Sequence, residues 1–258
     1  MQVNNFIKEK LAKGQPIIGI WSIINSPIPV DIAAHAGLDF QILDMEHGVF
    51  DLPSLENCIR ACESMHCSPL VRVPGLQPSI IQNCLDVGVH GIIVPQVKNY
   101  QETHNFIKAT RFPPEGLRGF NPFTRAGCYD PALSTATTKL NNEFALTSVI
   151  MENKSIFNDL EKILAIPELN LIYIGIYDLS FDLGFAGDVN HPEVVAYATD
   201  ALTKIRRAGK HAGLMVKNDN EMEKYLALGA NVIVCGVDAH IYYSAIKKNV
   251  SMFKKVIE

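Results

Sequence analysis

The stretch Phe40-Gln-Ile-Leu-Asp-Met-Glu-His-Gly48 begins as a mostly apolar run and ends in two carboxylates, an imidazole and a glycine. An apolar run of this length is typical of a buried strand. Because burying several ionisable groups is costly, Asp44, Glu46 and His47 are expected at the mouth of that strand, where water and partners are available. The alternative is an ordinary strand-to-helix loop with an acidic N-cap and a surface histidine. Later strands that end in the same way weigh against it.

Seven further apolar segments are predicted as strands, at 16–22, 68–74, 90–97, 146–152, 169–178, 211–216 and 231–236. Helical segments separate them, at 29–37, 52–65, 78–87, 100–110, 131–143, 156–164, 192–208, 218–228 and 239–257. Near-continuous apolar runs are typical of parallel strands that are buried on both faces. Eight such strands in 258 residues predict an α/β fold of the (β/α)8 TIM-barrel type. A doubly wound sheet is the alternative, but it would want a glycine-rich first turn, and neither GxGxxG nor GxxxxGK[ST] occurs.

The composition narrows the class of protein. Hydrophobic residues make up 48% of the chain, enough for a sizeable core, and charged residues make up 19%. The net charge is −4 without long charged runs, so nothing favours nucleic acid or a membrane surface as a partner. The N-terminal MQVNNFIKEKLAKG is predicted as an amphipathic helix and not as a signal peptide. With no linker or repeat in the sequence, one domain is expected over residues 1–258.

The six cysteines are scattered and form no CxxC pair. Cys58, Cys62 and His66 share a helical spacing that a zinc site could use, but buried free thiols on a core helix are favoured. This usage predicts reduced thiols and a cytoplasmic protein.

Polar side chains lie in or directly after most of the predicted strands. In a TIM barrel the carboxyl ends of the strands and the loops after them build the active site. The set comprises Asp44, Glu46, His47, Arg72, Gln96, Glu152, Asp178 and Asp238.

Glu152 and Asp178 are the candidate metal ligands, because both end predicted neighbouring strands and no Cys or His accompanies them. Oxygen ligands with open positions suit Mg²⁺ or Mn²⁺, and Co²⁺ is a further candidate. The alternative is that each carboxylate caps the helix after its strand.

Arg72 and His47 are the candidates for charge stabilisation and proton transfer. Arg72 is the only charged residue in its strand, and its planar guanidinium suits a carboxylate, either of a substrate or of Asp44 or Glu46. The pKa of histidine lies near working pH, so His47 is the candidate acid/base, with Asp44 or Glu46 to orient it. The strand cores contain no lysine, which disfavours a Schiff-base aldolase.

The segment from Arg111 to Asp130 has no clear periodicity and is predicted as an ordered functional loop. Its Arg118 and Arg125 could meet an acidic or phosphorylated ligand, or could form salt bridges within the loop or between subunits.

Over nearly its whole length the chain resembles the class II, metal-dependent pyruvate aldolases of the hydroxy-oxo-heptanedioate and 2-keto-3-deoxy-sugar-acid type, a superfamily that includes citrate lyase beta-like proteins. The resemblance rests on LDMEHG (43–48), LVRVP (70–74), LDVGVHGIIVPQV (85–97), RFPPEGLRGFNPFTRAGCY (111–129), IME (150–152) and IGIYDLS (174–180).

This resemblance implies reversible cleavage of a 4-hydroxy-2-keto acid to pyruvate and an aldehyde. It implies that Glu152 and Asp178 hold the metal, that His47 is the base and that Arg72 stabilises the transition state. It also implies that Asp86 raises the basicity of the histidine across a subunit interface. The expected assembly is a homo-oligomer, a hexamer or a dimer, often with exchanged C-terminal helices, here about 239–257.

Two positions that line the family's keto-acid pocket depart from its pattern. Ile150 stands where many relatives have Gln, and Ile176 stands where relatives usually have Pro, next to Tyr177. With Arg72 and Asp178, Ile150 and Tyr177 form the expected substrate-binding set. Because of these departures, a second hypothesis is a related reaction that forms a carbon–carbon bond, such as that of a citrate-forming enzyme of siderophore biosynthesis. A third hypothesis is a non-catalytic barrel.

Overall fold

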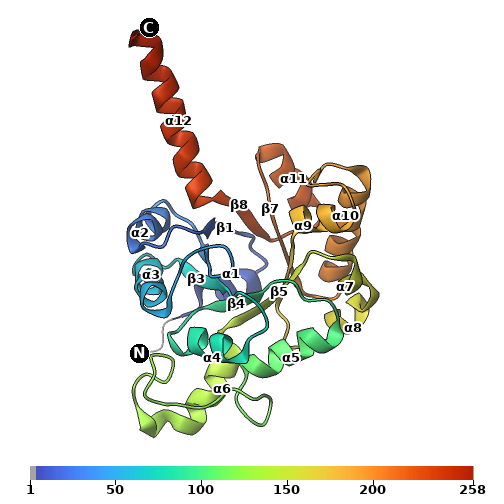
Figure 1. The fold of residues 1–258 in the computed structure, drawn as a ribbon. Coiled ribbons are helices and arrows are strands. Elements are labelled where there is room, and N and C mark those ends of the chain that lie inside the picture. The colour runs from blue at the N-terminus through green and yellow to red at the C-terminus, as the bar shows by residue number, and fades with distance from the viewer. Residues whose placement is uncertain (1–3, 258) are drawn as a thin grey trace.

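The protein is a closed parallel barrel of eight strands that pair in chain order, with the last strand pairing with the first (Figure 1). The computed structural model describes residues 4–257, with the side chains of residues 133–137 left out of the description. The strands are β1 (Ile17–Ser22), β2 (Phe40–Asp44), β3 (Ser68–Arg72), β4 (Gly91–Val94), β5 (Leu146–Met151), β6 (Leu171–Ile174), β7 (His211–Met215) and β8 (Val232–Val237). This confirms the predicted TIM barrel.

Between β1 and β8, helices follow the strands and cover the outside of the barrel, while α1 precedes the first strand and α12 follows the last. They are α1 (Phe6–Ala12), α2 (Pro27–His35), α3 (Leu52–Ser64), α4 (Pro78–Asp86), α5 (Tyr100–Thr110), α6 (Ser134–Phe144), α7 (Lys154–Asn158), α8 (Leu160–Leu164), α9 (Ile176–Asp182), α10 (Pro192–Arg207), α11 (Asp219–Ala227) and α12 (Asp238–Ile257). The predicted N-terminal helix is α1, and residues 1–3 of that prediction lie outside the described residues. Between residues 4 and 257, no helix is long and apolar enough to cross a membrane.

The core has two layers, as the alternation of side chains in a barrel requires. Inward-facing residues such as Phe40, Ile42 and Leu70 fill the barrel, and outward-facing residues such as Leu43 and Val71 pack against the helices. The register of β2 against β3 places Asp44 opposite Arg72. The ends of these two neighbouring strands therefore place a carboxylate and a guanidinium side by side at the mouth of the barrel.

The prediction of one strand over 169–178 is wrong at its carboxyl end. The strand β6 ends at Ile174, and α9 begins at Ile176, with the Leu179 N–H donating to the Gly175 carbonyl (3.0 Å). Periodicity cannot separate an apolar strand from the apolar first turn of a helix that follows it directly. Asp178 thus lies in the first turn of α9 and not at a strand end.

Three predicted helices after α1 differ from the structure by more than one residue. The helix expected at 131–143 begins with a 3-10 turn at Pro131–Leu133, and the α-helix α6 follows it. The helix expected at 29–37 begins at Pro27, because Ser26 caps it by accepting from the Ile28 N–H (3.3 Å). The helix expected at 156–164 is divided into α7 and α8 at Asp159, whose carboxylate accepts from the Tyr100 N–H (3.1 Å).

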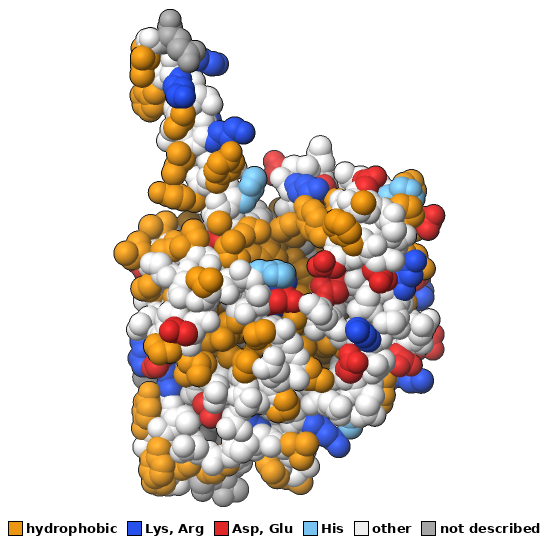
Figure 2. Space-filling model, viewed as in Figure 1, with side chains coloured by type: hydrophobic (Ala, Val, Ile, Leu, Met, Phe, Trp, Pro, Cys, Tyr) orange, Lys and Arg blue, Asp and Glu red, His pale blue; other side chains and the backbone are white. Residues whose placement is uncertain are grey.

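The C-terminal helix α12 points away from the barrel (Figure 1). None of its residues is buried, although apolar side chains run along it (Figure 2). The most exposed of these are Tyr242, Phe253, Val256 and Ile257. A helix with an unpaired apolar stripe is typical of a surface that packs against a partner.

Candidate active site

The carboxyl mouth of the barrel holds a cavity of about 290 Å³. Five of the eight residues predicted at the strand ends line it, whereas Glu46, Gln96 and Asp238 do not. Two aromatic residues to which the sequence gave no role, Trp21 and Tyr173, line it as well. The lining includes Trp21, Asp44, His47, Arg72, Ile150, Glu152, Tyr173, Ile176, Tyr177 and Asp178. The structure therefore brings these residues together at the mouth, which is the candidate active site.

Arg72 is held by two carboxylates of its own chain. Its Nε donates to Asp44 Oδ1 (2.8 Å), its Nη2 pairs with the other oxygen of Asp44, and its Nη1 lies 3.0 Å from Glu46 Oε2. The guanidinium also lies over the Trp21 ring, 4.3 Å from its centroid. Of the two partners considered for Arg72, the internal carboxylates are thus present, and a substrate carboxylate stays a prediction.

His47 lies at the rim of the cavity with 67% of its side chain exposed. Its Nε2 is 4.0 Å from Glu46 Oε2, and its backbone N–H donates to Asp44 Oδ1 (3.3 Å). Asp44 therefore fixes the turn that carries the histidine, while Glu46 is the carboxylate nearest to its ring. An exposed imidazole at the rim can exchange protons with both water and a ligand.

Glu152 follows β5 directly, and both it and Asp178 line the cavity. Neither caps a helix: Asn153 is the N-cap of α7 and Gly175 that of α9. Burial of the Glu152 carboxylate raises its pKa to about 7, and the nearby Asp178 and Glu46 carboxylates add to the effect. A divalent cation would offset this repulsion between acids, so the residues present fit one.

The donor set is small and made of oxygen. Among residues 4–257, no three His, Cys, Asp or Glu side chains cluster so as to hold a metal. Two carboxylates alone would leave most coordination positions of a hard cation to water and substrate, as Mg²⁺ sites in enzymes often do. The alternative zinc site on α3 has no such cluster either, and Cys58 and Cys62 are buried free thiols, as favoured from the sequence.

Gln96 forms hydrogen bonds with two acidic residues at the mouth, Glu152 and Glu46. Its backbone N–H donates to Glu152 Oε1, and its side-chain Nε2 donates to Glu46 Oε1 (2.9 Å). The sequence placed Gln96 after the fourth strand but gave it no role. Only its backbone conformation, with φ at +57°, shows how one residue reaches both acids.

One wall of the cavity is apolar and aromatic. Ile150 and Ile176 are buried, as is Tyr173, whose hydroxyl accepts from Trp21 Nε1 (3.1 Å). Trp21 and Tyr173 were missed because aromatic residues in apolar strands are indistinguishable from core residues. The positions that depart from the family pattern therefore lie beside the two acids, where they shape the pocket.

Asp86 does not reach the mouth of its own chain. It ends α4, which leads from the carboxyl end of β3 back to the start of β4, at the other end of the barrel. There its carboxylate pairs with Arg118 of the long loop, whose side chain is almost fully buried. A contribution of Asp86 to catalysis thus requires a second subunit, and stays a prediction.

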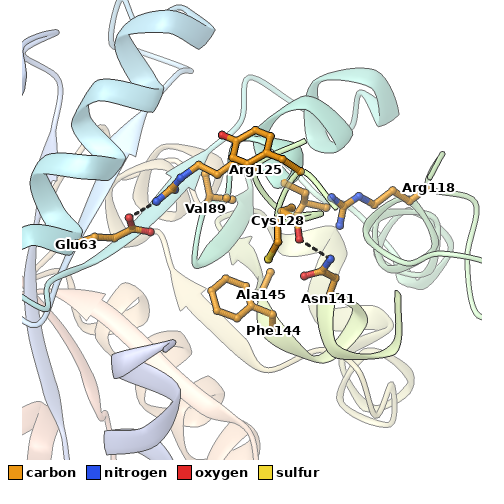
Figure 3. Close-up of a pocket in the computed structure, with 12 residues that line it drawn as sticks. Glu63, Val89, Arg118, Arg125, Cys128, Asn141, Phe144 and Ala145 are labelled. Carbon is orange, nitrogen blue, oxygen red and sulfur yellow. Dashed lines mark hydrogen bonds and ion pairs between the residues drawn. The ribbon is translucent and has the colours of Figure 1, made fainter. Parts of the chain in front are cut away.

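Arg118 and Arg125 of the long loop form salt bridges within the chain. Arg125 reaches across a cavity of about 220 Å³ to Glu63, and Arg118 enters the same cavity (Figure 3). Both are therefore engaged within the subunit. Asp238, another predicted site residue, accepts from the backbone N–H groups of Ile23 and Ile24 (3.0 Å each) and ties β8 to the loop after β1.

A parallel eight-stranded barrel with acids, an arginine and a histidine at its carboxyl mouth defines the class of TIM-barrel enzymes. Within that class, the chain belongs to the HpcH/HpaI aldolase/citrate lyase family, whose sequence profile matches residues 17–245.

Relatives of known name cover nearly the whole chain. A hydroxypyruvate/pyruvate aldolase of Agrobacterium fabrum is 32% identical over 251 residues, covering 97% of this chain and 94% of that protein. A 4-hydroxy-2-oxo-heptane-1,7-dioate aldolase of Klebsiella pneumoniae is 33% identical and covers 92% and 89%. The chain is thus similar to carbon–carbon lyases over its full barrel.

Solved structures with the same fold include a HpcH/HpaI aldolase of Desulfitobacterium hafniense, with a TM-score of 0.90, 25% identity and 96% of each chain covered. The citrate synthase SbnG superposes with a TM-score of 0.89, at 26% identity and 98% coverage of each chain.

Proposed function

We propose that this protein is a divalent-metal-dependent aldolase that reversibly cleaves a 4-hydroxy-2-keto acid to pyruvate and an aldehyde. The observation that carries the proposal is the convergence of Glu152, Asp178, Arg72 and His47 on one cavity. The names of the relatives, pyruvate and hydroxy-oxo-acid aldolases, support the same reaction class.

Glu152 and Asp178 would hold the cation, with Mg²⁺ or Mn²⁺ preferred and Co²⁺ as a further candidate. When bound, the cation supplies positive charge that stabilises negative charge developing on the keto oxygen of the substrate. The chain needs no lysine for this task, in agreement with the lack of one in the lining of the cavity.

Arg72 and His47 carry the remaining chemistry in this proposal. Arg72 would place its charge beside the keto acid, while Asp44 and Glu46 keep the guanidinium in one orientation. His47 would accept the proton of the C4 hydroxyl as the C3–C4 bond breaks and the aldehyde forms. In the reverse direction it would return that proton.

Ile150 and Tyr177 would contact the substrate beside Asp178. Ile150 is apolar where many relatives have an amide, so its side chain cannot donate a hydrogen bond to the keto acid. We therefore expect the substrate carboxylate to depend more on Arg72 and on the cation.

A citrate-forming condensation is the second candidate, favoured by the likeness to citrate synthase SbnG and by the departures at Ile150 and Ile176. One experiment separates the two. Purified protein with Mn²⁺ is given either a 4-hydroxy-2-keto acid or oxaloacetate plus acetyl-CoA, and the release of pyruvate or of free thiol is followed. Pyruvate release alone supports the aldolase, and thiol release alone supports the condensation.

We also infer a cytoplasmic, single-domain protein that acts as a homo-oligomer, a hexamer or a dimer. The exposed apolar stripe of α12 supports exchange of this helix between subunits. Asp86 would then act on the His47 of a neighbouring subunit. This fits the position of Asp86, which lies at the end of the barrel opposite the mouth of its own subunit.

A further inference from the structure

We propose that Gln96 is a positioning residue with two separate tasks: its backbone amide selects the oxygen of Glu152 that meets the cation, and its side-chain amide fixes Glu46 against Arg72. The proposal rests on the function proposed above, since it concerns how the same site is held. No other described residue contacts both acids by hydrogen bonds in this structure.

The first task follows from the geometry of the Glu152 carboxylate. The Gln96 N–H donates to Oε1, so that oxygen is engaged within the protein. The other oxygen, Oε2, faces the turn that leads to Asp178, because a Cβ added at Gly175 would lie 3.1 Å from it. Oε2 is therefore the oxygen presented to the side of the pocket where the second carboxylate lies.

This donation depends on an unusual backbone. Gln96 adopts φ +57°, in the left-handed region that residues other than glycine seldom occupy. The chain after it is fixed, since the Val97 side chain is buried and its carbonyl accepts from Asn153 Nδ2 (3.0 Å). Strained backbone held by its surroundings is common at functional sites.

The second task concerns the two oxygens of Glu46. Oε2 lies 3.0 Å from Arg72 Nη1, and Oε1 accepts from Gln96 Nε2 (2.9 Å). With both oxygens engaged, the carboxylate cannot turn away from the guanidinium. Without the amide of Gln96, Glu46 would be free to rotate, and the orientation of Arg72 would lose one of its supports.

Three variants separate the tasks. Gln96→Met keeps the length and the backbone N–H but removes the side-chain amide. Gln96→Gly also keeps the N–H and favours a positive φ. Gln96→Val disfavours that φ because its side chain is β-branched, so it turns the N–H away from Glu152. Gln101→Met is the matched control, since the amide of Gln101 donates to Asn105 (2.9 Å) on the exposed face of α5 and, among the described residues, makes no hydrogen bond to the site.

Mn²⁺ affinity is measured without substrate by electron paramagnetic resonance. The values of kcat, KM and melting temperature are then measured on the same samples. We expect Gln96→Val to weaken Mn²⁺ binding by roughly tenfold or more, the usual range for residues that orient metal ligands. Gln96→Met and Gln96→Gly should keep Mn²⁺ affinity within about twofold but lose roughly tenfold in kcat. The control should match the wild type throughout.

Wild-type Mn²⁺ affinity in Gln96→Val would overturn the first task, and wild-type kcat in Gln96→Met would overturn the second. A lower melting temperature with both quantities unchanged would make Gln96 a purely structural residue, which also overturns the proposal. Failure of the proposed reaction is a different result: the wild type would then bind Mn²⁺ but release no pyruvate.

Discussion

Arg72 sits among acidic side chains that would otherwise repel one another. It pairs with Asp44 and Glu46, and its charge also acts on Glu152. A guanidinium that is fixed by two carboxylates, with its flat face on Trp21, needs little reorganisation when charge develops nearby. This is the arrangement that a transition state with a developing oxyanion requires.

Replacing Arg72 by Lys keeps the charge but loses the two-pronged contact with Asp44. We expect kcat/KM for the keto acid to fall roughly ten- to hundredfold, the usual effect of losing a charged hydrogen-bond partner. Steady-state kinetics and melting temperature are measured on the same sample. A lower melting temperature with normal kinetics would mean that Arg72 serves only its internal salt bridges.

The metal ligands are tested by Glu152→Gln and Asp178→Asn, which keep the size of each side chain. Loss of a negatively charged ligand should abolish Mn²⁺ binding and activity together. Calorimetric titration of Mn²⁺ checks the first and pyruvate release the second. Activity of the wild type that survives excess EDTA would remove the metal from the mechanism.

For His47→Ala we expect turnover to fall by roughly 10²–10⁴-fold, as for other general bases, with Mn²⁺ affinity kept. The imidazole lies at the exposed rim, and we do not assign it as a ligand. The pH–rate profile is the deciding readout. A profile identical to that of the wild type would show that another group moves the proton.

Much of the site could be predicted at this scale because strand ends carry a recognisable polar signature. Asp44, Arg72 and Glu152 lie at or next to observed strand ends, as predicted. Gln96 and Tyr173 could not be assigned roles, since the first acts through its backbone and the second lies in an apolar strand. The type of a residue alone indicates neither a hydrogen bond made by its backbone nor whether an aromatic side chain in an apolar strand lines a cavity.

At the scale of elements, every predicted strand is present in the structure, although several are shorter than predicted, because buried parallel strands read as apolar runs. Most helix bounds agree to within a few residues. The short helix α9 was missed since its first turn continues the apolar run of β6. This error shifts the position of Asp178 from a strand end to a helix, but keeps it in the same cavity.

The element with the clearest testable property is α12, which carries an apolar stripe although none of its residues is buried within the described part of the subunit. If the proposed homo-oligomer forms through this stripe, placing charge on it with Ile246→Asp and Phe253→Asp should reduce the assembly to a smaller species. Light scattering after size-exclusion chromatography measures the mass. Ser251→Asp, on the polar face of the same helix, is the matched control and should leave the mass unchanged, because residues three and four apart share a face and Ser251 is not so spaced from Ile246 or Phe253. An unchanged mass in the double variant would contradict the exchange of α12.

At the scale of the whole molecule, the end of the barrel opposite the site sets part of its pH stability. Burial lowers the pKa of His211 to about 4, with the Arg206, Lys8 and Lys210 cations adding to the effect. The unfolded chain takes up this proton near the ordinary value of 6.5, so the unfolded state binds more protons between about 6.5 and 4. Stability from this group is therefore present above 6.5 and is lost as pH falls toward 4.

We expect His211→Gln to flatten that part of the pH dependence, because glutamine does not titrate. Urea midpoints between pH 4 and 7 compare the variant with the wild type. His104→Gln, a change of the same kind on α5, is the control. Equal slopes for His211→Gln and the wild type would contradict the assignment.

The central claim, that the mouth of this barrel uses a divalent cation to make pyruvate acidic at its methyl group, can be tested without knowing the aldehyde. Pyruvate is incubated with the protein in D₂O, and loss of the methyl proton signal is followed by NMR. We predict exchange with Mn²⁺ or Mg²⁺ present that stops with EDTA and is absent in Glu152→Gln. Exchange that continues at the same rate in EDTA, or no exchange with any divalent cation, would contradict the account.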